Sequence, residues 1–135
     1  MLTQISIYTE NKKGVLEHIT GIFAEKEINI DAMLVNDSAE FGTARFVVDK
    51  PDEAVKALTE AGYITKSTRV VGVFLDDNYG ELNKLLKRIL DANISLDYIY
   101  ATFERESAAP IVILKSEEES DVIESILLRY GYRLK

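Results

Sequence analysis

A short glycine turn occurs twice in this sequence, at residues 10–16 (ENKKGVL) and 75–82 (LDDNYGEL). Each copy has one glycine, a leucine two positions later, and then apolar residues at helical spacing. Glycine lets another group approach the backbone closely, and the free N–H groups at the start of a helix attract an anion. Both turns therefore favour the binding of a carboxylate.

Polar side chains beside the two glycines extend this chemistry. Asn11 or Asp77 could cap the following helix by accepting hydrogen bonds from its first amides, and Asn78 could do the same one residue later. The sequence leaves open which of them caps. A nearby carboxylate or amide would hold an ammonium group. Together, a carboxylate site and an ammonium site describe a receptor for a free amino acid.

Alternating and helical apolar patterns predict the elements that position the turns. The predicted strands are residues 3–9, 28–36, 43–49 and 63–69, then 70–75, 94–103, 110–115 and the C-terminal GYRLK. The predicted helices follow Gly14, Pro51, Gly80 and the acidic run at 117–119. The order is β-α-β-β-α-β, twice. We therefore expect an α+β fold of antiparallel sheets with helices on one face of each sheet.

The two halves of the chain align with each other. A single constant shift pairs Gly14 with Gly80, and Ile28 with Ile94. A slightly larger shift pairs GYITK with GYRLK, because a short insertion precedes the last helix. Ordered matches across most of both halves indicate a duplication. We expect two units, residues 1–69 and 70–135, without a linker between them.

Composition narrows the classes of function. The chain has 135 residues, a formal net charge of −7 and a pI of about 4.8, which argues against general nucleic-acid binding. It has no cysteine, which excludes disulfides, Cys-zinc sites and thiol catalysis, and its single histidine is His18. It has no apolar run of about 18 residues, so we expect no membrane span. Because the first residues read as a strand rather than a signal peptide, we expect a cytoplasmic protein.

No residues in the sequence form a plausible catalytic set. The sequence contains no plausible nucleophile–base pair, no metal-ligand set and no nucleotide-binding loop. We therefore expect neither an enzyme nor a cofactor. Each half has about 65 residues, which is a marginal size for an independent core. A sheet with helices on one face also leaves its other face open. We therefore expect a homodimer.

These motifs resemble the ACT domain, a family in which the turn typically reads Asp-x-Pro-Gly-x-Leu and the second strand opens with Gly-x-Asn-Ile. Residues 11–16 and 28–30 carry the resemblance in the first half, and residues 77–82 and 93–96 carry it in the second. It covers nearly the whole chain as two tandem copies. The resemblance implies two ferredoxin-like βαββαβ units.

ACT domains are small regulatory modules that often bind amino acids and control metabolic enzymes or transcription. Ligands of the family commonly lie between two ACT units, touching the first turn of one unit and the second strand of its neighbour. The resemblance implies a ligand site made of Asn11, Lys12, Lys13, Gly14, Val15, Leu16, Asn29 and Ile30 in the first copy, and of Asp77, Asn78, Tyr79, Gly80, Glu81, Leu82 and Ser95 in the second.

The sequence also departs from the family pattern. Lys13 and Tyr79 stand where the family has proline, and Asn11 lacks the charge of the family's acidic residue. Glu27 replaces the glycine before the second strand, whereas Asn93 tolerates a left-handed backbone better. The two turns therefore need not bind equally, and Lys12 and Lys13 have the alternative interpretation of solvated surface residues.

Three other functions share parts of this pattern. The first is a protein-interaction module that binds no ligand. The second is nucleic-acid binding, since the RNA-recognition motif has the same topology, but TARFVVD and PIVILK lack its Lys/Arg-Gly-Phe pattern. The third is an acylphosphatase-like enzyme, but ENKKGVL has no arginine in the turn. We therefore expect an amino-acid-binding regulatory protein whose partners are a free amino acid and a metabolic enzyme.

Overall fold

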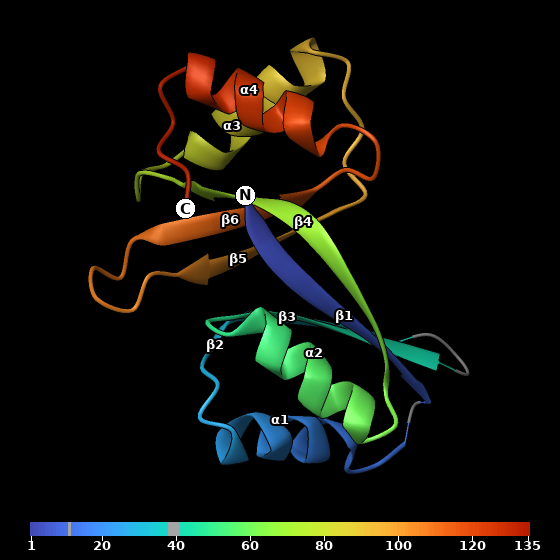
Figure 1. Ribbon diagram of the computed structural model, residues 1–135. Coiled ribbons are helices and arrows are strands. Elements are labelled where there is room, and N and C mark those ends of the chain that lie inside the picture. Colours follow the sequence, from blue (N-terminus) through green and yellow to red (C-terminus); the bar gives the residue numbers. More distant parts are fainter. Residues whose placement is uncertain (11, 38–40) are drawn as a thin grey trace. The chain divides into compact units, whose positions relative to one another are not determined.

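The computed structural model describes residues 1–10, 12–37 and 41–135 and contains the expected alternation of strands and helices (Figure 1). The chain forms two compact units, an N-terminal unit of residues 3–68 and a C-terminal unit of residues 1–2 and 69–135. The elements in chain order are β1 (Leu2–Glu10), α1 (Val15–Glu25), β2 (Ile30–Asp37), β3 (Phe41–Val48), α2 (Pro51–Glu60), β4 (Ile64–Phe74), α3 (Glu81–Asp91), β5 (Tyr98–Phe103), β6 (Pro110–Lys115) and α4 (Ser120–Arg129).

The N-terminal unit is a sheet covered on one face by α1 and α2 (Figure 1). Its strand order is β2-β3-β1-β4, and β3 pairs antiparallel with both β1 and β2. Ile5 and Ile7 alternate along β1 toward the helices and are fully buried. The rings of Phe23 on α1 and Phe46 on β3 meet edge to face, with centroids 5.2 Å apart. The core of this unit therefore lies between the sheet and the two helices.

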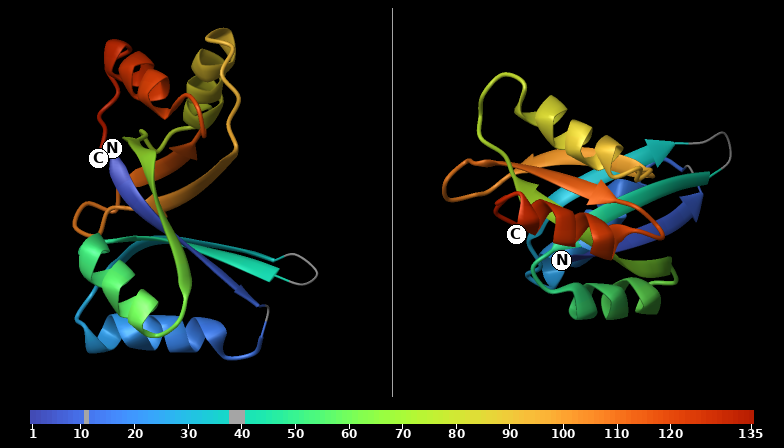
Figure 2. Two further views of the ribbon diagram at one scale, coloured as in Figure 1. Left: turned by 45° about the vertical axis from the view of Figure 1, so that its right-hand side comes forward. Right: turned by 90° about the horizontal axis from the view of Figure 1, so that it is seen from above.

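The C-terminal unit repeats this arrangement with the strand order β4-β6-β5, and α3 and α4 cover one face of its sheet (Figure 2). Antiparallel pairing joins β6 to both neighbours. Val71 and Val73 on β4 and Leu114 on β6 pack against Leu85 of α3 and Leu127 of α4, and all five are buried. Together the two units confirm the predicted α+β class and its antiparallel sheets.

The largest differences between the strands and the sequence prediction occur at three places. The two strands expected at 63–69 and 70–75 are one continuous strand, because no glycine or proline turn interrupts the β-branched run. The C-terminal GYRLK forms only a single bridge, between Leu134 and Val73. In addition, β5 begins at Tyr98 rather than at residue 94. The Asp97 side chain there accepts a hydrogen bond of 2.6 Å from the N–H of Glu117, which turns the chain before the strand starts.

The second helix of each unit ends in the same way. Gly62 and Gly131 adopt left-handed conformations with φ of 91° and 83°. The N–H of Gly62 donates to the carbonyl of Thr59, and the N–H of Gly131 donates to that of Leu128, each over 3.0 Å. These bonds close the last helical turn, as a glycine after a helix end commonly does. Within the described part of the chain, no helix is long and apolar enough to cross a membrane.

Candidate functional site

The two glycine turns of the sequence have the same backbone geometry. Gly14 has φ 89° and ψ −3°, and Gly80 has φ 85° and ψ −4°. The N–H of Val15 donates to the carbonyl of Lys12 over 3.4 Å, and at the matching place in the second turn the N–H of Glu81 donates to that of Asn78 over 3.4 Å. A left-handed backbone of this kind costs free energy for a residue with a Cβ, so glycine is favoured at both turns.

The start of α3 is not capped as the sequence suggested. Gly14 and Gly80 themselves occupy the N-cap positions, and no described side chain hydrogen-bonds there. The prediction that Asp77 or Asn78 caps α3 is therefore wrong. A glycine at the N-cap has no side-chain oxygen to accept from the first amides, and Asn78 takes part through its backbone, its N–H donating to the carbonyl of Asp76 over 2.9 Å. Asn11 lies outside the described residues.

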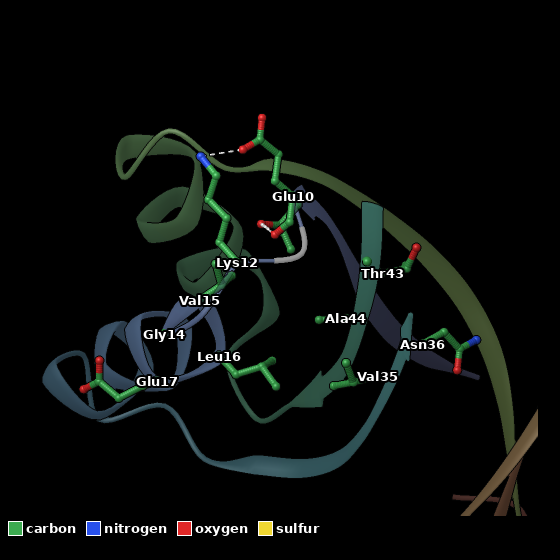
Figure 3. A pocket seen from close by; sticks show the side chains of 12 residues that line it. Glu10, Lys12, Gly14, Val15, Leu16, Glu17, Val35, Asn36, Thr43 and Ala44 are labelled. Atoms are coloured by element: carbon green, nitrogen blue, oxygen red, sulfur yellow. Dashed lines mark hydrogen bonds and ion pairs between the residues drawn. The ribbon is translucent and has the colours of Figure 1, made fainter. Parts of the chain in front are cut away.

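A pocket of about 360 Å³ lies beside the first turn, between α1 and the ends of β1, β2 and β3 (Figure 3). This volume falls within the usual range for small-molecule sites. Its lining combines the glycine turn with side chains from the two strands of the hairpin. The lining residues are Thr9, Glu10, Lys12, Gly14, Val15, Leu16, Glu17, Val35, Asn36, Gly42, Thr43 and Ala44.

Four of the predicted site residues line this pocket, namely Lys12, Gly14, Val15 and Leu16. The contribution of the hairpin was missed. Val35 on β2 pairs with Ala44 on β3, and this register brings both strands to the turn. The signal available in the sequence was the apolar alternation along TARFVVD, but that pattern alone does not say which strand lies next to the turn.

Apolar side chains form one wall of the pocket. Leu16, Val35 and Ala44 point toward one another in Figure 3, whereas Glu17 points away from them. Ala44 is buried, but Leu16 and Val35 remain 40% and 43% exposed. A hydrophobic surface thus stays open to solvent inside a concave site.

An ion pair lies at the other end of the pocket. The Lys12 Nζ is 2.5 Å from the Glu10 Oε2, and both side chains are well exposed. The hydrogen bond and charge of Lys12 hold the pKa of Glu10 below its ordinary value, and those of Glu10 raise the pKa of Lys12. Both groups therefore carry their charges at neutral pH.

Three predicted residues of the N-terminal unit do not line this pocket. Lys13 is exposed beside the turn. Asn29 and Ile30 stand at the start of β2, whereas the pocket contains Val35 and Asn36 near its end. The N–H of Asn29 donates to the Asp49 carboxylate over 2.9 Å, and its carbonyl accepts from the N–H of Asp49 over 3.2 Å. These bonds join the starts of β2 and α2, so Asn29 has a structural role within its own unit.

The C-terminal unit has a pocket of about 410 Å³ with a different lining. It is formed by Phe74, Leu75, Asp76, Glu81, Ala109, Gly131, Tyr132 and Arg133. Among the residues predicted for the second site, Glu81 lines it, whereas Asp77, Asn78, Tyr79, Gly80, Leu82 and Ser95 do not. Glu81 takes the position that Val15 holds in the first turn. The two turns therefore have the same backbone conformation, but the side chains at matching positions differ in polarity and charge.

Two compact α+β units, each with a helix that starts at a left-handed glycine, define a tandem ferredoxin-like protein. The family described as ACT domain pair matches residues 1–131, and the chain belongs to this family.

Three solved structures resemble the chain. Protein BT0572 from Bacteroides thetaiotaomicron has a TM-score of 0.89 and 28% identity, covering 99% of this chain and 91% of that chain. The ligand-free regulatory subunit of aspartate kinase from Thermus thermophilus has a TM-score of 0.68 and 14% identity, covering 96% and 93%. Aspartokinase III of E. coli, in complex with lysine and aspartate, has a TM-score of 0.54 and 16% identity, covering 96% of this chain and 31% of that chain. At 14% and 16% identity, the last two structures are similar to this chain in fold alone.

Proposed function

We propose that this protein is a non-catalytic sensor that binds a free amino acid in the pocket beside the first glycine turn and thereby regulates amino-acid metabolism. The pocket itself is the observation that carries the proposal. It joins Lys12, Gly14 and Leu16 of the turn to the β2–β3 hairpin in a volume of about 360 Å³. Membership of the ACT domain pair family supports the same function.

The charges and amides at the pocket suit a zwitterion. The N–H of Val15 donates to the carbonyl of Lys12, but the N–H groups that follow it in the first turn of α1 have no acceptor within the helix and favour an anion near Gly14. Lys12 adds a positive charge for a carboxylate, and Glu10 adds a negative charge for an ammonium group. An amino acid carries both groups on one carbon, so it can satisfy the two charges at once.

Regulation through a partner enzyme is supported by the structural relatives. The Thermus thermophilus relative is the regulatory subunit of an aspartate kinase, and the E. coli aspartokinase III was solved with lysine and aspartate bound. We infer by analogy that the partner of this protein is a metabolic enzyme whose activity follows the concentration of the bound amino acid.

We also propose that the protein acts as a homodimer. The edge strand β2 exposes apolar Met33, at 44%, and Phe41 at the start of β3 is 59% exposed. Apolar groups on an open sheet edge favour association with a second chain. Sedimentation should give about twice the 15.2 kDa mass of one chain. A monomer at micromolar concentration would contradict the dimer without affecting ligand binding.

Thermal melting with each of the twenty common amino acids tests the sensor directly. A ligand at 100 times its Kd adds about 2.7 kcal/mol to the free energy of unfolding and should raise Tm by several degrees. Calorimetry would then give the affinity. If no amino acid raises Tm or gives binding heat, the sensor proposal is wrong.

A pair of glycine variants controls for backbone strain in this test. Gly14→Asp places a carboxylate at the proposed anion site and should abolish the response to ligand. Gly62→Asp places the same side chain at a similar φ, 91° against 89° at Gly14, and an added Cβ has no atom within 4 Å at either position. The Gly62→Asp protein should keep the response, so loss of binding in both variants would argue against the proposed location.

The alternative function is an interaction module that binds no ligand. The exposed Met33 and Phe41 favour it as much as they favour the homodimer. In that case Gly80→Asp and Gly14→Asp would leave assembly and capture of a partner intact, and every amino acid would fail in the melting experiment.

A further inference from the structure

The apolar wall of the first pocket carries information about the side chain of its ligand. Leu16 on α1 and Val35 on β2 face each other across the pocket, with Ala44 of β3 beside them (Figure 3). Leu16 and Val35 are 40% and 43% exposed, so a ligand in this position would remove apolar surface from water. An aliphatic group that covers this apolar surface lowers the free energy of binding, whereas a charged group placed there does not.

The ion pair lies at the end of the pocket opposite the apolar wall. Of the three charged lining residues, Glu10 and Lys12 form their ion pair of 2.5 Å, and Glu17 points away from the apolar wall (Figure 3). The hairpin contributes only uncharged residues to the lining, namely Val35, Asn36, Gly42, Thr43 and Ala44. A second charge on a ligand's side chain would lie against Leu16 and Val35 without a partner, which is unfavourable.

Resting on the proposed function, we propose that the pocket selects an amino acid with an uncharged aliphatic side chain of valine to leucine size. The ammonium and carboxylate groups lie at Glu10, Lys12 and the start of α1, and the side chain lies between Leu16 and Val35. Amino acids with a charged side chain, such as lysine and aspartate, bind more weakly. This preference is particular to the first pocket, because Glu81 holds the position of Val15 in the second turn.

Calorimetry with glycine, alanine, valine, leucine, lysine and aspartate on the full chain tests the selection. The affinity should rise roughly fourfold for each methylene added between alanine and leucine, as burial of one such group predicts. Lysine and aspartate should bind at least about tenfold more weakly than leucine. Tighter binding of lysine or aspartate, or equal affinities along the series, would overturn the selection but leave the amino-acid sensor standing. No binding by any of the six or by the other common amino acids would overturn both.

Variants of the apolar wall test whether Leu16 and Val35 determine which amino acid the pocket binds. Leu16→Ser should weaken leucine binding about tenfold and leave glycine binding unchanged, because glycine has no side chain to reach the wall. Leu128→Ser is the matched control on α4, where the leucine is 56% exposed and outside the pocket, and it should bind leucine normally. Val35→Ser tests the same wall from the sheet if Leu16→Ser fails to fold. Leucine affinity that is unchanged in both wall variants contradicts the proposal.

Discussion

Gly14 and Gly80 adopt the same left-handed conformation, with φ of 89° and 85°, although they lie in different halves of the chain. Each is followed at once by a helix, and the carbonyl of each accepts a hydrogen bond from the N–H four residues later, of 3.0 Å at His18 and 2.9 Å at Lys84. Both copies of the duplicated unit have thus kept the backbone of the turn. Only the side chains around it have diverged, from Val15 to Glu81 at the first helical position.

We expect Gly14→Ala and Gly80→Ala each to lower the free energy of unfolding by about 1–2 kcal/mol. An added Cβ would meet no atom within 4 Å at either glycine, so the loss would come from the positive φ alone. Urea unfolding measures it. Gly21→Ala, within α1 and without a positive φ, is the control and should gain up to about 1 kcal/mol. If Gly14→Ala is as stable as the parent protein, the left-handed turn is not populated in solution.

Replacing Glu27 by glycine should stabilise the protein. Glu27 follows α1 with φ 55°, a conformation that strains a side chain, and Asn93 has φ 58° at the matching position after α3. We expect Glu27→Gly to gain about 0.5–1 kcal/mol in urea unfolding, and Asn93→Gly to gain less, because asparagine tolerates this conformation better. Glu25→Gly, inside the last turn of α1, should instead lose about 1 kcal/mol. A loss of stability in Glu27→Gly would contradict the strain.

The Glu10–Lys12 ion pair predicts a measurable titration. Lys12 lowers the pKa of Glu10, so the ionised carboxylate is favoured in the folded state, and this contribution is present above the ordinary pKa of a glutamate and lost as pH falls through the depressed one. Lys12→Ala should raise the pKa of Glu10 toward its ordinary value in an NMR titration. Lys13→Ala removes an equal charge one residue away and should leave the titration unchanged. An identical Glu10 pKa in the parent and in Lys12→Ala would mean that the pair does not form in solution.

Removing one ring of the aromatic pair in the core of the N-terminal unit should lower the free energy of unfolding more than the glycine substitutions do. Phe46 is fully buried and its ring meets that of Phe23 edge to face. Phe46→Ala should cost about 3–5 kcal/mol, as removal of a buried aromatic ring from a packed core does. Phe41→Ala, on the same strand but 59% exposed, should cost less than about 1 kcal/mol. Chemical denaturation of both variants measures the difference, and similar losses would show that Phe46 is not a core residue.

Much of the local structure was predictable because it depends on neighbouring residues. The apolar alternation of residues 3–9 predicts β1, and the helical spacing from Val15 to Phe23 predicts α1. Glycine at positions 14 and 62 marks a turn and a helix end, since few other residues accept a positive φ. The match between the two halves predicted the tandem fold, because a repeated pattern of periods implies a repeated unit.

The pocket depends on contacts that no local pattern contains. Val35 and Ala44 reach the turn at Gly14 through the antiparallel register of β2 and β3, and that register depends on burying the correct face of the hairpin against the helices. Sequence alone therefore determined the elements and the glycine turns, since these follow from neighbouring residues. Tertiary structure decided which side chains surround the first turn, because strand pairing joins residues that lie far apart in the chain.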